Sequence, residues 1–151
     1  MTTINDRHEI AQAYRTGHVQ LDRILTDVLR GVAERHPATN HLWQLCESLR
    51  MPLQQHFEEE EGHGFLAVIP VKFPALEERC QHLRAEHGEL GSELQSICDN
   101  LRSGDGTVTW WNELEARVHR FAVQLGNHES AECRLLEAAD FIREFDAEPT
   151  D

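Results

Sequence analysis

Residues 75–101 read ALEERCQHLRAEHGELGSELQSICDNL and carry the clearest helical pattern in the chain. Their apolar residues recur at spacings of four and three, which places them on one face of an α-helix. This apolar stripe consists of Leu76, Cys80, Leu83, Leu90, Leu94, Ile97 and Leu101. His87 takes the place of an apolar residue between Leu83 and Leu90. The stretch therefore predicts an amphipathic helix with one polar residue in its buried face.

The same spacing appears in three other segments, and strand-like alternation is absent. We expect four helices, at about residues 5–35, 40–68, 75–101 and 109–145. Their separators are His-Pro at 36–37, IPVKFP at 69–74 and RSGDG at 102–106, which contain residues that end helices or form turns. Pro52 predicts a kink or a fresh start inside the second helix. Short connections favour an all-α, antiparallel, up-and-down four-helix bundle.

Length and composition fit one soluble domain that spans residues 1–151. The formal net charge of −13 opposes binding to nucleic acid, which is held mainly by Lys and Arg. No apolar run is long enough for a membrane span, and the polar start is unlike a signal peptide, so we expect a cytoplasmic protein. The four cysteines form no CxxC pair, and Cys46, Cys80 and Cys98 fit buried, reduced thiols.

Each apolar stripe is interrupted near its midpoint by a residue that is unusual in an apolar core. The interrupting residues are His18, His56 with Glu60, His87, and His128 with Glu132. An antiparallel bundle brings the middles of its helices to one level, so these six side chains should converge. Residues four apart lie on one helix face, with Cβ atoms roughly 6 Å apart, so each H-x-x-x-E pair can present an imidazole and a carboxylate together.

A metal centre explains this polar layer better than a hydrogen-bonded one. A carboxylate buried without compensation costs several kcal/mol, and no Lys or Arg interrupts the stripes at that level. Imidazole and carboxylate ligands suit iron or manganese, and two carboxylates able to bridge suit two ions. Taken singly, these residues fit satisfied core histidines and solvated glutamates, especially in the Glu58–Glu61 run. Their shared register in four helices favours metal.

The same residues carry a family resemblance over essentially the whole chain. The segments are GHVQLDRIL around His18, LQQHFEEEEGHGFL around His56, AEHGELGSEL around His87 and LGNHESAECRLL around His128. The sequence resembles the hemerythrin-like (HHE cation-binding) domains. The resemblance implies a four-helix bundle with two non-haem iron ions, oxo- or hydroxo-bridged, in which the glutamates bridge the irons and the histidines cap them.

The match departs from the oxygen-carrying hemerythrins at two places. Those proteins place a second His four residues away on the third helix, where this chain has Leu83 and Gly91. They usually carry Asp five residues after the fourth-helix His, where this chain has Cys133 and offers Glu132 instead. A different ligand count leaves a different number of open iron positions, which weakens the case for simple oxygen carriage. His63, seven residues after His56, is the best candidate for an extra ligand.

Three functions stay open at this point. The preferred one is a protein that binds or senses dioxygen or nitric oxide at a carboxylate-bridged di-iron centre; a sensor of this kind would need a separate redox or signalling protein partner. The second is a di-iron peroxidase, oxidase or iron-supplying repair protein, favoured if Cys133 beside Glu132 is redox-active. The third is a metal-free interaction bundle. Six glycines near the proposed ligands fit either space for a small ligand, such as a diatomic molecule or peroxide, or close helix packing.

Overall fold

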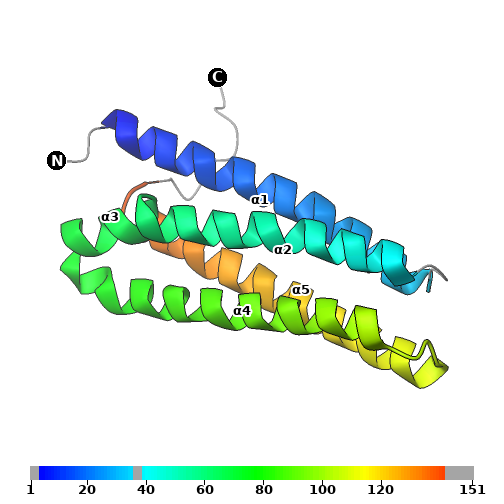
Figure 1. Cartoon of the computed structure of the whole chain (residues 1–151). Helices are drawn as coiled ribbons and strands as arrows, with labels where there is room; N and C mark the ends of the chain where they lie inside the picture. Colours follow the sequence, from blue (N-terminus) through cyan, green and yellow to red (C-terminus); the bar gives the residue numbers. More distant parts are fainter. Residues whose placement is uncertain (1–3, 36–38, 142–151) are drawn as a thin grey trace.

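The computed structural model describes residues 4–35 and 39–141 of the 151-residue chain. Four long helices lie side by side in these residues (Figure 1): α1 (Ile4–Ala33), α2 (Thr39–Gly62), α4 (Glu77–Ser103) and α5 (Val108–Ala138). A short helix, α3 (Phe65–Lys72), and a single 3₁₀ turn, η1 (Pro74–Leu76), connect α2 to α4. The described part of the chain contains no strand, which confirms the all-α bundle.

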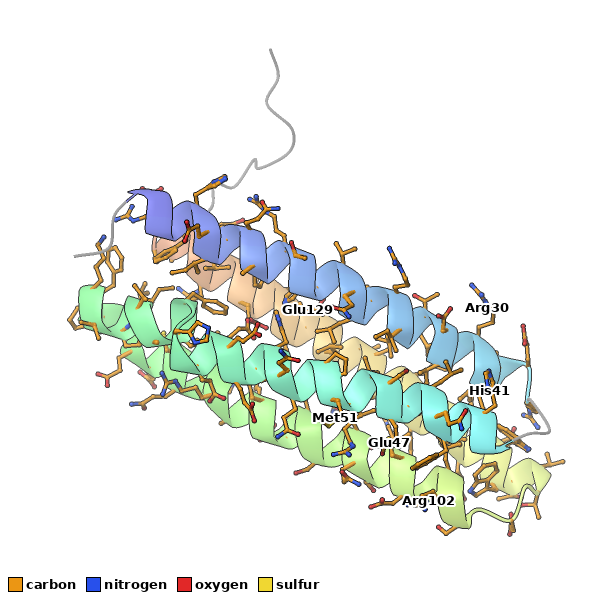
Figure 2. All side chains as sticks on the ribbon, turned by 45° about the horizontal axis from the view of Figure 1, so that its top comes forward. Arg30, His41, Glu47, Met51, Arg102 and Glu129 are labelled. Atoms are coloured by element: carbon orange, nitrogen blue, oxygen red, sulfur yellow. The ribbon has the colours of Figure 1, made fainter. Side chains whose placement is uncertain are left out.

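The long helices alternate in direction. Arg30 near the end of α1, His41 near the start of α2 and Arg102 at the end of α4 all lie at the end of the bundle away from α3 (Figure 2). Successive helices therefore run up and down, as the short connections predict. No described helix is long and apolar enough to cross a membrane.

The segment expected to form one helix at 40–68 is divided in two. The N–H groups of His63 and Gly64 both donate to the Glu59 carbonyl, at 3.2 and 2.8 Å, and this closes α2. Gly64 then adopts an extended conformation before α3 begins, and a methyl group there would lie 2.8 Å from the Glu60 Cα atom. The turn therefore requires glycine, and the apolar pattern after it continues only because α3 also packs on the core.

Two other expected helix features differ from the structure. The fresh start that Pro52 could have caused is absent, because α2 continues through this residue; Leu49 and Leu53 on either side are buried, and their packing offsets one lost backbone hydrogen bond. The last helix ends at Ala138 rather than 145, where Asp140 adopts a positive φ of 62°. Residues 142–145 of the expected helix lie outside the described residues.

The apolar core consists of two clusters separated by a polar layer. The larger cluster includes Leu21, Leu53, Leu90 and Leu125, and it continues toward the end of the bundle away from α3. The smaller cluster includes Leu83, Leu135 and the α3 residues Phe65, Leu66 and Ile69. On α4, His87 lies between Leu83 of one cluster and Leu90 of the other. The bundle thus buries apolar side chains above and below one level, and polar side chains at that level.

Candidate metal centre

The polar layer brings together all six residues that the sequence singles out. They form two groups: His18 with His56 and Glu60, and His87 with His128 and Glu132. Within each group the possible ligand atoms lie within 4.8 Å of one another. His18 is half-buried and the other five are buried. Each group therefore offers two imidazoles and one carboxylate in a shielded position.

Each group comes from one helical hairpin. The helices α1 and α2 supply the first group, and α4 and α5 supply the second. In both hairpins the first helix gives a single His and the second gives the H-x-x-x-E pair. Ring contacts follow the same division, since the centroids are 4.9 Å apart for His18 and His56 and 4.8 Å apart for His87 and His128.

Glu60 lies at the junction of the two groups. Its Oε1 atom is 3.5 Å from Nε2 of His56 and also 3.5 Å from Nε2 of His87. The carboxyl group of Glu132 also interacts with that of Glu60. The two carboxyl groups are thus close enough for each to influence the pKa of the other.

The inner polar atoms of this layer are buried without hydrogen-bond partners among the described residues. They are Nε2 of His56, His87 and His128, and both carboxylate oxygens of Glu60 and Glu132. Nε2 of His128 lies 2.7 Å from Oε1 of Glu132, yet the pair does not have hydrogen-bond geometry. Buried polar groups almost always find partners. Lone pairs that converge without bonding to each other fit a shared cation.

Burial perturbs the acid–base chemistry of the layer. It raises the pKa of Glu60 well above its ordinary value and that of Glu132 to about 8. It lowers the pKa of His18 to about 3 and that of His56 to about 4, with a smaller effect from neighbouring histidines. Each shift favours the uncharged form, because no counter-charge compensates the lost hydration. A divalent cation would supply that counter-charge.

The family model of the Hemerythrin HHE cation binding domain matches residues 9–139, a range that contains both groups. The chain belongs to this family. No curated protein and no solved structure matches the chain. The two His/Glu groups give this HHE domain residues that could hold metal cations.

The second group of the HHE domain has outer carboxylates that the sequence analysis missed. Nδ1 of His128 lies 2.9 Å from Oε1 of Glu86, and Nδ1 of His87 lies 3.5 Å from Oε2 of Glu61. The contact between Glu86 and His128 is a hydrogen bond, and such a partner holds a ligating imidazole in one orientation and leaves its other nitrogen free for metal. The contact between Glu61 and His87 is not a hydrogen bond, because Nδ1 of His87 has no hydrogen-bond partner among the described residues. Glu61 belongs to the Glu58–Glu61 run, whose pattern indicates a solvated helix face. Glu86 precedes His87, but only the packing of α4 against α5 directs it to His128.

Aromatic rings fix the imidazoles from the side. The Phe57 ring stacks on His87 with centroids 3.8 Å apart and planes 10° apart. The centroids of the Tyr14 and His18 rings lie 4.0 Å apart. The Tyr14 hydroxyl donates a hydrogen bond to the Glu129 carbonyl at 3.1 Å. Burial raises the pKa of Tyr14 above its usual range, so this hydroxyl stays protonated. Each ring packs against the histidine that it contacts.

The glycines near the proposed ligands have two possible roles, which are close helix packing and space for a small ligand. A methyl group on Gly17 would lie 2.5 Å from Nδ1 of His56, so this glycine permits close packing of α1 on α2. A methyl group on Gly62, Gly88 or Gly126 would meet nothing within 4 Å, and these three glycines are exposed. Gly62 and Gly126 therefore face outward, whereas Gly88 lines a pocket that also reaches His87.

The remaining histidines lie outside both groups. His63, the expected extra ligand, is exposed and lines a pocket that also reaches His56 and Glu60. His8, His41, His82 and His119 are exposed. His36 is not among the described residues. Cys46, Cys80 and Cys98 are buried free thiols, as expected.

Proposed function

We propose that this HHE domain binds two iron ions, one at each group, and uses the pair to bind dioxygen or nitric oxide. The observation that carries the proposal is the position of Glu60, whose Oε1 atom is equally distant, at 3.5 Å, from an imidazole nitrogen of each group. A carboxylate so placed can serve both ions. Glu132, whose carboxyl group interacts with that of Glu60, would be the second carboxylate ligand.

The choice of iron follows from the donor atoms. Each group offers two imidazole nitrogens and a carboxylate, with no thiolate. Two imidazoles with one carboxylate are typical of non-haem iron(II) sites that keep open coordination positions. Reduced iron at such a site supplies electrons and free positions for a diatomic ligand. Manganese accepts the same ligands, so metal analysis of the purified protein must distinguish the two.

The chain's own residues have separate roles in this proposal. The four histidines and two glutamates hold the ions, and Glu86 orients His128. Phe57 and Tyr14 pack against the imidazoles of His87 and His18. Leu53 and Leu90 on one side of the layer and Leu83 on the other are at most 4% exposed, so apolar side chains enclose the centre along the bundle.

Neither alternative function receives comparable support. Burial and the neighbouring Glu137 raise the pKa of the Cys133 thiol, so the reactive thiolate is rarely formed, and redox chemistry at this residue is disfavoured. A metal-free interaction bundle would leave Glu60 and Glu132 buried without partners, which costs stability and brings no benefit.

Two measurements on purified, iron-replete protein test the proposal. Metal analysis should give two irons per chain, and the optical spectrum of the reduced protein should change reversibly when air or nitric oxide is admitted and then removed. Irreversible oxidation with turnover of peroxide would instead support the enzyme alternative. Protein that takes up no transition metal would support the metal-free bundle.

A further inference from the structure

A pocket of about 500 Å³ leads from the surface to the first group. It lies between α1, the end of α2 and the start of α3. The buried residues His56 and Glu60 line its inner part, and the exposed residues Glu9, Glu59 and His63 line its rim. Solvent molecules or a ligand can therefore approach the His18 group from this side.

The pocket walls between rim and floor are mainly apolar. Ile10 and Tyr14 of α1 line the pocket together with Phe65 and Val68 of α3. Phe65 packs edge-on against Tyr14, with centroids 5.8 Å apart. The short helix α3 contributes no member of either histidine group. Its side chains thus shape the approach to the centre and do not hold the centre itself.

The pocket is much larger than a diatomic ligand requires. A water molecule occupies about 30 Å³ of liquid, and an apolar cavity of about 150 Å³ already accommodates benzene. Pockets of roughly 300–1,000 Å³ with apolar walls and a few polar groups are typical of sites for organic ligands. A volume of about 500 Å³ falls within that range.

The charges of the lining select against anions. The residues that line the pocket include Glu9, Glu59 and Glu60 but no Lys or Arg. The whole chain, with these residues included, has a formal net charge of −13. In the metal-free chain, a carboxylate or phosphate ligand would be repelled on approach and would find no cationic side chain to pair with.

We propose that this pocket binds a small organic molecule, about the size of a single substituted ring and without negative charge, next to the His18–His56–Glu60 group. Its apolar body packs between Ile10, Phe65 and Val68, and its polar end faces either the His56–Glu60 floor or the acidic rim. The proposal concerns the metal-free chain and does not depend on the proposed function, because the described side chains alone form the pocket.

Three probes with the same ring and different charge test the pocket. Benzylamine, benzyl alcohol and benzoate are titrated separately into the metal-free full-length chain. Binding is followed by calorimetry and by NMR signals of Tyr14 and Phe65. Benzylamine and benzyl alcohol should bind, each at least tenfold more tightly than benzoate. Failure of both to bind, or equal binding of benzoate, would overturn the proposal.

Blocking variants test the location. Ala13 is exposed and lines the pocket, so Ala13→Trp should fill it and weaken benzylamine binding at least tenfold. Val68→Phe blocks the pocket from the opposite wall and serves if the first variant does not fold. Val123→Trp, at an exposed position on α5 that does not line the pocket, is the matched control. Unchanged binding in both blocking variants would overturn the assignment.

The outcome separates this proposal from the proposed function. Benzylamine binding by a chain that takes up no iron would overturn the di-iron function and support the pocket. Two bound irons without benzylamine binding would support the di-iron function and overturn the pocket.

Discussion

Nε2 of His87 on α4 lies 3.5 Å from Oε1 of Glu60 on α2, and this contact joins the two histidine groups across the bundle. Because the same oxygen is also 3.5 Å from His56, a single carboxylate belongs to both groups. The binding of one ion should therefore favour the binding of the other.

Replacement of Glu60 should remove at least one metal ion. Glu60→Gln keeps the shape of the side chain but removes the negative charge that would serve both ions, so bound iron should fall below two per chain. Plasma mass spectrometry on the purified variant measures this. Glu58→Gln, on the exposed face of the same helix, should retain the full metal content. Retention of both ions by Glu60→Gln would refute the ligand assignment.

Gly17→Ala should weaken the first group. The added methyl group would lie 2.5 Å from Nδ1 and 2.7 Å from Cε1 of His56, so the imidazole or helix α1 must move. Overpacking of this kind costs roughly 1–3 kcal/mol, and metal affinity should fall with it. Gly126→Ala is the control, because nothing lies within 4 Å of its added methyl group; it should stabilise the helix by up to about 1 kcal/mol. Thermal unfolding and metal titration compare the two variants.

Glu86→Gln should lower metal affinity at the second group roughly 10- to 100-fold, as loss of an outer hydrogen-bond partner typically does. The reason is that Glu86 accepts from Nδ1 of His128 and so leaves Nε2 available for metal. Competition with a chelator measures the affinity, and nitrogen NMR of the zinc-loaded chain reports the His128 tautomer. Glu89→Gln, exposed on the same helix, should change neither.

The metal-free chain should lose stability as the pH rises from 6.5 to 8. Folding raises the pKa of Glu132 from 4.5 to about 8, so the folded chain keeps a proton that the unfolded chain releases. Folding also raises the pKa of Glu129, to about 7, so this residue likewise lowers stability as the pH rises. The loss should be about 1–2 kcal/mol in urea unfolding. Glu132→Gln should flatten this dependence. His18 and His56 have lowered pKa values and act in the opposite direction. They lower the stability of the folded chain as the pH falls below 6.5, where both residues gain a proton in the unfolded chain before they do so in the folded chain.

Removal of metal should lower the melting temperature. An ion present at a hundred times its dissociation constant stabilises the folded state by about 2.7 kcal/mol. For a chain of this size that corresponds to roughly 5–10 °C. Differential scanning calorimetry before and after chelation measures the change. An equal melting temperature in both samples would show that the ions contribute nothing to folding.

The bundle and the six inner residues were accessible from sequence because both depend on helical periodicity. His87 stands in an apolar stripe at a position where only a buried side chain fits, and the same logic identified His128 with Glu132. Register within one helix is a local property. The level at which four antiparallel helices meet follows from their lengths.

The features that escaped prediction depend on contacts between helices. Glu86 reaches a histidine on α5, and nothing in the sequence around position 86 specifies that neighbour. The turn at Gly64 was missed because the apolar pattern continues through it into α3. The pocket escaped prediction for the same reason, because α3, which begins after that turn, supplies part of its wall.

The division of the six residues between two hairpins has a consequence for how such a centre could be built. Each hairpin offers a single His and then an H-x-x-x-E pair, so two identical half-length peptides related by a twofold axis would present the same donors. A symmetric dimer of helical hairpins is therefore a sufficient ancestor, or a sufficient design, for this arrangement. Fusion of the halves then allows each to diverge. The outer carboxylates at the second group and the pocket at the first group are differences of that kind.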